Sequence, residues 1–146
     1  MNTEITFLFF RLLMTLSLLT CPGALNDKLP LVKGQSLTAV QIYTDDQLLN
    51  LIKENKHLSQ VVLDECQLVQ DIEARAIKAK LPSYQFLWGD MLAYGVCIKK
   101  DIALGLYYMR LAADQGLVEG MEQIGRYYHV GKFMQVDMDQ AILFLK

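Results

Sequence analysis

The second half of the chain repeats itself at a fixed interval, and this self-similarity limits the possible folds more than any other feature. Three pairs of identical residues lie 36 positions apart: Gly89 and Gly125, Gly95 and Gly131, and Asp101 and Asp137. A period of this length is typical of paired helices that stack into a solenoid. The sequence therefore predicts an all-α fold, a helix-hairpin solenoid.

The repeated glycines fall where a helical hairpin needs them. Gly89 and Gly125 lie within apolar, helix-like segments, where a glycine costs about 1 kcal/mol relative to alanine and usually indicates a closely packed neighbouring backbone. Gly95 and Gly131 stand just past those segments, where a left-handed C-cap favours glycine. Each repeat is therefore expected to contain a helix that ends at a glycine.

The repeated aspartates complete the unit. Asp101 and Asp137 stand where an N-cap is needed to open a second helix. We expect the helices to span residues 83–94, 101–115, 117–130 and 137 to the end. The first repeat then covers residues 83–116, and a second, incomplete repeat covers 117–146.

The first 24 residues have the plan of a secretory signal peptide. Residues 5–19 are almost entirely apolar, Arg11 supplies a positive charge, and Cys21-Pro-Gly-Ala supplies small residues near a cleavage point. A transmembrane anchor is the alternative, but a span needs about 20 unbroken apolar residues. Lipidation at Cys21 is a further alternative, because Leu18-Leu19-Thr20-Cys21 resembles a lipoprotein signal.

Between the leader and the repeats, the chain divides into a tether, residues 25–39, and a pre-repeat helical segment, residues 40–82. Residues 39–43 are a short β-prone run. Thr44-Asp45-Asp46-Gln47 then fits a capping box, which predicts a helix from Asp45 that ends in the polar stretch 53–57.

A second capping-box pattern occurs at Asp64-Glu65-Cys66-Gln67. Apolar residues at helical spacing follow it. We therefore expect a longer helix that begins at this box, with Cys66 in its first turn, and that Pro82 bounds near Leu81.

Removal of the leader leaves two cysteines, Cys66 and Cys97. In an oxidising compartment two cysteines are expected to pair. The bridge would close a span of about 30 residues and contribute about 3 to 4 kcal/mol in the chain-entropy model. Two alternatives stay open, namely buried free thiols and a reactive Cys66 whose thiol pKa is lowered by a helix N-terminus.

Composition argues against most catalytic and nucleic-acid-binding classes. The formal net charge is −2 with no basic block, so the electrostatic footprint of a nucleic-acid binder is missing. His57 and His129 have no second ligand at metal-site spacing, and the sequence holds no Gly-rich phosphate loop and no GxSxG motif. The sequence therefore predicts no catalytic, cofactor-binding or metal-binding residue.

Two other groups of residues have structural interpretations. Four acidic residues could suggest a sodium site, but N-cap roles and a solvated face account for them: Asp90, Asp101, Asp114 and Glu119. Core and inter-helix packing accounts for most of the aromatic residues at helical spacing: Tyr84, Phe86, Trp88, Tyr94, Tyr107, Tyr108, Tyr127 and Tyr128.

The repeats resemble the Sel1-like repeat family. In the first copy the likeness rests on Leu-Trp-Gly-Asp-Met-Leu-Ala-Tyr-Gly-Val at 87–96, Asp101, Leu106-Tyr107-Tyr108, Ala112-Ala113 and Gly116. The second copy supplies Ile124-Gly125, Tyr127-Tyr128, Gly131, Asp137 and Ala141. Tyr84, where the repeat usually has alanine, and Cys97 in the inter-helix loop depart from the pattern.

A wider resemblance extends into the pre-repeat helices. Residues 40–49, 66–72, 84–97 and 105–109 resemble the MotX family of sodium-driven polar flagellar motor proteins. The resemblance implies a periplasmic, non-enzymatic component of the T ring that joins a MotY-like protein and helps stator units containing a PomB-like subunit to assemble. A general secreted adaptor, a regulator of an envelope enzyme and a thiol enzyme are the alternatives.

The resemblance also implies further helical material beyond Lys146. We therefore expect a truncated product or partial sequence, in which Ile142, Leu143, Phe144 and Leu145 form an open apolar edge.

Overall fold

The computed structural model describes residues 41–146, so the predicted signal peptide and tether lie outside the described residues. Within this part the regular structure is entirely helical, which confirms the predicted all-α fold. Gln41, Ile42 and Tyr43 form no strand, and the rest of the β-prone run lies outside the described residues. None of the helices between residues 41 and 146 has the length and apolar character needed to cross a bilayer.

The pre-repeat segment begins as the capping box predicts. Helix α2 spans Asp45–Lys53 and buries Leu48 and Ile52. The Thr44 hydroxyl accepts a bond from the Gln47 backbone N–H at 3.3 Å, and the Gln47 side chain accepts one from the Thr44 N–H at 2.9 Å. These two bonds satisfy backbone donors that the first turn leaves free.

The prediction of a second capping box, at Asp64, is wrong. A helix that the sequence analysis missed, α3, spans His57–Leu63, and Asp64 is its C-cap. Glu65 and Cys66 follow in left-handed conformations, with φ values of 54° and 60°. Helix α4 begins only at Val69, without a side-chain cap, and spans Val69–Ile77.

The reason for the error is a competing interaction of Asp64. Its carboxylate accepts hydrogen bonds from the Gln60 amide, at 2.9 Å, and from the Tyr43 hydroxyl. A carboxylate held by a residue 21 positions earlier in the chain is not available to cap the residues that follow it.

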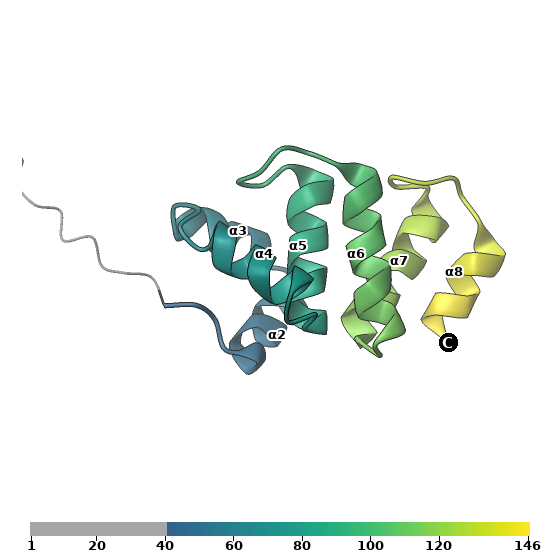
Figure 1. The fold of residues 1–146 in the computed structure, drawn as a ribbon. Coiled ribbons are helices and arrows are strands. Elements are labelled where there is room, and N and C mark those ends of the chain that lie inside the picture. The colour runs from purple at the N-terminus through teal and green to yellow at the C-terminus, as the bar shows by residue number, and fades with distance from the viewer. Residues whose placement is uncertain (1–40) are drawn as a thin grey trace, which may run out of the picture. The chain divides into compact units, whose positions relative to one another are not determined.

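Helix α5, Pro82–Tyr94, is the centre of the fold (Figure 1). Pro82 occupies its first turn, where the missing N–H would have no partner. Every residue from Ser83 to Ala93 is buried, because α2, α3, α4 and α6 all pack against it. A helix that is apolar on all sides needs this complete cover.

The remaining helices form the two repeats. Helix α6 spans Ile102–Asp114, α7 spans Val118–Val130, and α8 spans Met138–Leu145. In Figure 1 the helices α5 to α8 stand side by side in chain order, and the α5–α6 and α7–α8 loops lie at the same end. Each helix packs on the next, as in a helical repeat solenoid.

The two inter-helix loops have the same backbone geometry. Gly95 and Gly131 are left-handed C-caps with φ values of 74° and 70°. Asp101 and Asp137 accept bonds from the backbone N–H three residues later, at 3.0 and 2.9 Å, and so cap α6 and α8.

Candidate functional site

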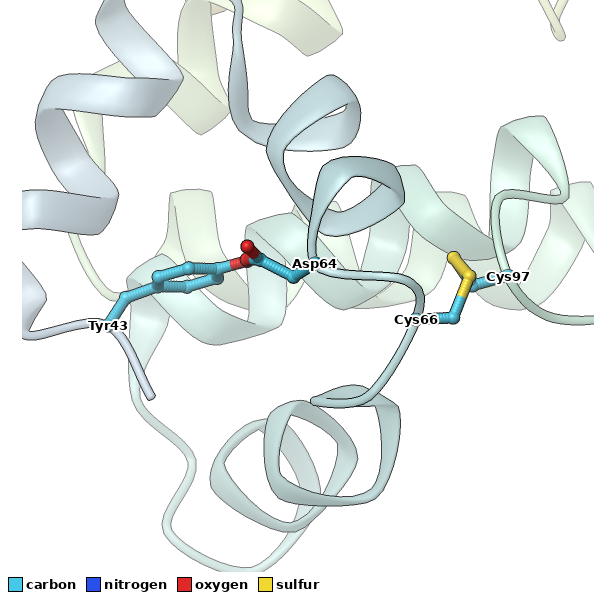
Figure 2. Close-up of a disulfide and its surroundings, with 4 residues drawn as sticks. All are labelled: Tyr43, Asp64, Cys66 and Cys97. Atoms are coloured by element: carbon cyan, nitrogen blue, oxygen red, sulfur yellow. A yellow bond between two sulfur atoms is a disulfide. The ribbon is translucent and has the colours of Figure 1, made fainter. Parts of the chain in front are cut away.

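The pre-repeat helices join the repeats through three polar or covalent links, and we call this region the junction. The first link is the disulfide between Cys66 and Cys97, with a Cα–Cα distance of 5.6 Å (Figure 2). It ties the turn after α3 to the α5–α6 loop. The predicted cysteine pair is therefore present, and neither sulfur is a free thiol.

The prediction that Cys66 lies in the first turn of a helix is wrong. Cys66 lies in the turn before α4, and both bridged cysteines have positive φ, 60° for Cys66 and 62° for Cys97. Residues with a side chain rarely adopt this conformation. The hypothesis of a reactive Cys66 required the cysteine to lie at a helix N-terminus. Because Cys66 does not lie in a helix, that hypothesis is wrong.

The second link runs through two tyrosines. The Tyr43 hydroxyl donates to Asp64, as Figure 2 shows, and the Tyr84 hydroxyl on α5 donates to the Tyr43 carbonyl oxygen. Burial, followed by the hydrogen bond to Asp64, raises the pKa of Tyr43 above its ordinary value. Burial also raises the pKa of Tyr84. Both rings therefore stay protonated and hold the start of the segment on α5.

The third link is a buried pair of side chains, His57 of α3 and Asp90 of α5. Their exposed fractions are each 3%. The His57 Nε2 atom lies 2.7 Å from Asp90 Oδ2, and the His57 ring lies 5.5 Å from the Phe86 ring. The other ring nitrogen, Nδ1, is buried and has no partner. The carboxylate thus anchors the start of α3 to the centre of the fold.

Tyr127 extends this link into the second repeat. Its hydroxyl lies 3.5 Å from Asp90 Oδ1 and 3.1 Å from the Tyr94 hydroxyl, and it accepts a 2.6 Å bond from Gln123 Nε2. Burial, followed by the charge of Asp90, raises the pKa of Tyr127. A continuous polar chain therefore crosses from α3 through α5 to α7.

The polar contacts that join His57, Asp90 and Tyr127 were not predicted from the sequence. Asp90 was expected on a solvated face, and His57 was treated as part of a polar terminator. The signal that could have identified Asp90 is its position inside α5, whose other residues are mostly apolar. A carboxylate there must be paired, because an unpaired buried charge is very costly.

The four acidic residues considered for sodium do not come together. Asp90 is buried beside His57, and Asp101 caps α6. Asp114 ends α6 at an exposed position, and Glu119 lies 3.9 Å from the Lys53 amine. No group of three or more His, Cys, Asp or Glu side chains within residues 41–146 could hold a metal ion.

The repeat glycines differ in what surrounds them. A Cβ on Gly89 would lie 2.7 Å from the Gly105 carbonyl oxygen, whereas one on Gly125 would lie 2.7 Å from a Leu145 side-chain carbon. Gly116 has a φ of 92° and no neighbour near its Cβ position. In the first repeat, Gly89 therefore packs against the backbone of α6. In the second repeat, Gly125 packs against a side chain of α8.

Two largely apolar surfaces lie outside the junction. A cavity of about 310 Å³ lies between α4 and α6, with Ile77, Tyr107 and Leu111 in its wall. On α8, Ile142 and Leu143 are 48% and 64% exposed, whereas Phe144 of the predicted apolar edge is half-buried and its ring stacks on Tyr128 at a centroid distance of 6.0 Å.

Comparison with known proteins confirms the resemblances drawn from the sequence. Residues 82–117 and 118–146 match the Sel1 repeat. The chain is 61% identical over 89 residues to the sodium-type polar flagellar protein MotX of Vibrio parahaemolyticus serotype O3:K6 (strain RIMD 2210633). The matched residues are 61% of this chain and 42% of that relative, so the match spans less than half of the relative's length.

Proposed function

We propose that this protein is a non-enzymatic structural component of a sodium-driven polar flagellar motor. The observation that carries the proposal is the 61% identity to the sodium-type polar flagellar protein MotX over 89 residues. The chain would act in the periplasm, as part of the T ring. Its partners would be a MotY-like ring protein and a PomB-like stator subunit.

The structure supports a role based on protein contacts. The described residues form stacked helices, and such solenoids present extended surfaces to partners. The disulfide between Cys66 and Cys97 is of the kind that persists in the oxidising periplasm, and the predicted leader would deliver the chain there.

The polar side chains at the junction also favour a structural role. Asp90 contacts both His57 and Tyr127, all three residues are buried, and the two contacts tie three helices together. Their hydrogen bonds are directed into the protein, which is the arrangement expected of groups that fix a packing geometry.

Co-fractionation with the motor tests the proposal. The tagged chain would be expressed with its own leader in a sodium-motile host that lacks its MotX-like protein, and hook-basal bodies would be purified and probed for the tag. We expect the tag in the basal-body fraction. A matched variant without residues 1–24 should stay in the cytoplasm and be absent from that fraction.

The opposite outcome would favour another function. If the tagged chain is stable in the periplasm but absent from basal bodies, the motor assignment for this chain is wrong. A general secreted adaptor or a regulator of an envelope enzyme would then be the better interpretation. The same fractionation with the full-length relative is the positive control.

A further inference from the structure

The last helix of the described chain, α8, has one side that no other helix covers. In Figure 1 it stands at the end of the row of helices, and it packs mainly on α7. Ala141 is buried, so it marks the side that faces α7. Four large apolar residues of α8 are 48% to 64% exposed: Met138, Ile142, Leu143 and Leu145. Exposed apolar groups that lie together usually mark an interaction site.

The uncovered side of α8 carries four side chains in a symmetric order. Asp139, Ile142, Leu143 and Lys146 are separated by three, one and three positions, which is the spacing of residues on one face of a helix. All four are exposed. At about 100° per residue, this face is centred nearly opposite the buried Ala141. We call these four residues the α8 face.

The charges at the two ends of the α8 face are not used within residues 41–146. The ion pairs in that part of the chain all join other residues: Lys53 with Glu119, Lys56 with Glu54, His57 with Asp90, and Arg126 with Glu122. The face is therefore negative at Asp139, apolar in the middle and positive at Lys146. An occupant that complements it needs the same order of groups running in the opposite direction.

We propose that the α8 face binds the α8 face of a second copy of this chain, with the two helices antiparallel. The point midway between Asp139 and Lys146 is also midway between Ile142 and Leu143. A two-fold axis at that point places each Asp139 opposite Lys146 of the second copy, and each Ile142 opposite Leu143 of the second copy. Two-fold dimers use the same self-complementary surface on both subunits in this way.

The dimer should be weak, because the contact is small. Helix α8 has eight residues and is about 12 Å long, so the contact is smaller than the roughly 1,200 Å² that stable complexes bury. The apolar centre supplies the attraction, and the terminal charges fix the direction of the helices. We expect a dissociation constant on the order of 100 µM. This association goes beyond the proposed motor function and does not depend on it.

Sedimentation equilibrium of the purified oxidised chain tests the proposal. The chain would lack residues 1–24 and carry a short Gly-Ser extension after Lys146, which moves the terminal carboxylate away from the lysine. We expect the average mass to rise from that of one chain toward that of two between about 5 and 500 µM, as the expected dissociation constant predicts.

A pair of apolar variants locates the contact. Leu143→Gln places a polar group at the centre of the α8 face and should weaken the dimer about tenfold, because an apolar side chain loses its burial. Leu63→Gln is the matched control. Leu63 is 75% exposed on α3, away from the α8 face, so its substitution should change the dissociation constant less than twofold.

A mixing experiment tests the antiparallel direction. Asp139→Lys makes both ends of the face positive, and Lys146→Asp makes both ends negative, so each variant alone should dimerise about tenfold more weakly, as like charges repel. An equimolar mixture brings opposite charges together at both ends. The mixture should therefore dimerise within about threefold of the unsubstituted chain.

Three outcomes would overturn the proposal. It is wrong if the chain stays monomeric up to about 500 µM, a result that would leave the face to another occupant, such as a helix of a partner protein. It is also wrong if Leu143→Gln dimerises like Leu63→Gln, or if the mixture dimerises no better than the separate variants. Because no motor component is present, failure here leaves the motor assignment untouched, and failure of the basal-body assay leaves this dimer untouched.

Discussion

The two repeats share their backbone geometry but not their surroundings. Cys97 and Phe133, 36 positions apart, occupy the same place in their loops and have φ values of 62° and 63°. In the first repeat this position is bonded to Cys66. In the second, the Phe133 ring packs edge-on against Tyr94 and Tyr127, each with a centroid distance of 5.3 Å.

The same contrast holds inside the helices. Position 90 in α5 is a buried aspartate, whereas its equivalent in α7 is Arg126, whose side chain is 58% exposed. The first repeat is covered on both sides by other helices, and the second ends at α8, which exposes Ile142 and Leu143. The repeat pattern thus determines the local backbone, while the neighbours determine how much each position contributes to stability.

The largest difference in lost stability between the two repeats should appear when the residues at positions 90 and 126 are substituted. Asp90→Ala leaves buried His57 without its carboxylate, and removal of one partner of a buried pair costs about 3 to 5 kcal/mol. Arg126→Ala should cost less than about 0.5 kcal/mol, because surface ion pairs contribute little. Urea unfolding followed by the fluorescence of the single tryptophan, Trp88, measures both. Equal losses would contradict the contrast.

The next largest difference should appear at positions 97 and 133. The double variant Cys66→Ser and Cys97→Ser should lose about 3 to 4 kcal/mol, because the bridge closes a loop with a sequence separation of 31. Phe133→Ala, which removes a half-buried ring, should lose about 1 to 2 kcal/mol.

Reductant provides the control for that comparison. It should lower the stability of the unsubstituted chain and of Phe133→Ala by similar amounts, and leave the double cysteine variant unchanged. A fall in the double variant would show that reductant acts elsewhere.

The losses of stability at positions 89 and 125 should differ by a similar amount. An alanine Cβ at position 89 meets the Gly105 carbonyl oxygen and the Met109 backbone nitrogen, which cannot move alone, so we expect a loss of about 2 to 3 kcal/mol. At position 125 it meets Cγ and Cδ2 of Leu145, a side chain that is 51% exposed and can turn outward, and the gain of about 1 kcal/mol in helix propensity should offset that shift. Urea unfolding measures the free energy of unfolding of both variants. Equal losses for Gly89→Ala and Gly125→Ala would contradict this expectation.

The parts of this fold that could be predicted are those with local signals. The 36-residue offset located the helices of both repeats to within about one residue, since Gly95, Gly131, Asp101 and Asp137 cap them by bonds to near neighbours. The Thr44 box likewise predicted the start of α2. The predicted export of the chain favoured a bridge between Cys66 and Cys97, the two cysteines that follow the predicted leader, and the structure contains that bridge.

What could not be predicted depends on distant residues. The Asp64 pattern matches a capping box, but a bond from Tyr43, 21 positions away, redirects that side chain. The short helix α3 has no capping side chain, and its first residue is fixed by Asp90, 33 positions later. A local sequence pattern carries no information about such distant pairs. The contacts at the junction could therefore be identified only from the structure.

Substitution of the two N-cap residues should change stability least. The two substitutions should nevertheless differ in whether the whole fold or only one helix is affected. Asp101 and Asp137 make the same bond, at 3.0 and 2.9 Å, so each substitution by alanine removes about 1 kcal/mol from its own helix. Helix α6 packs between α5 and α7, whereas α8 packs mainly on α7. Loss of the Asp101 cap should therefore lower global stability, since α6 cannot open without exposing its neighbours.

Loss of the Asp137 cap should act locally instead. Because α8 can fray while the other helices stay folded, Asp137→Ala should speed amide hydrogen exchange between Met138 and Leu145 by about fivefold, as 1 kcal/mol predicts. The urea midpoint should stay the same. If Asp137→Ala instead lowers the midpoint as much as Asp101→Ala does, α8 unfolds together with the core. The second repeat is then as integral to the fold as the first, and the difference between them is confined to their surfaces.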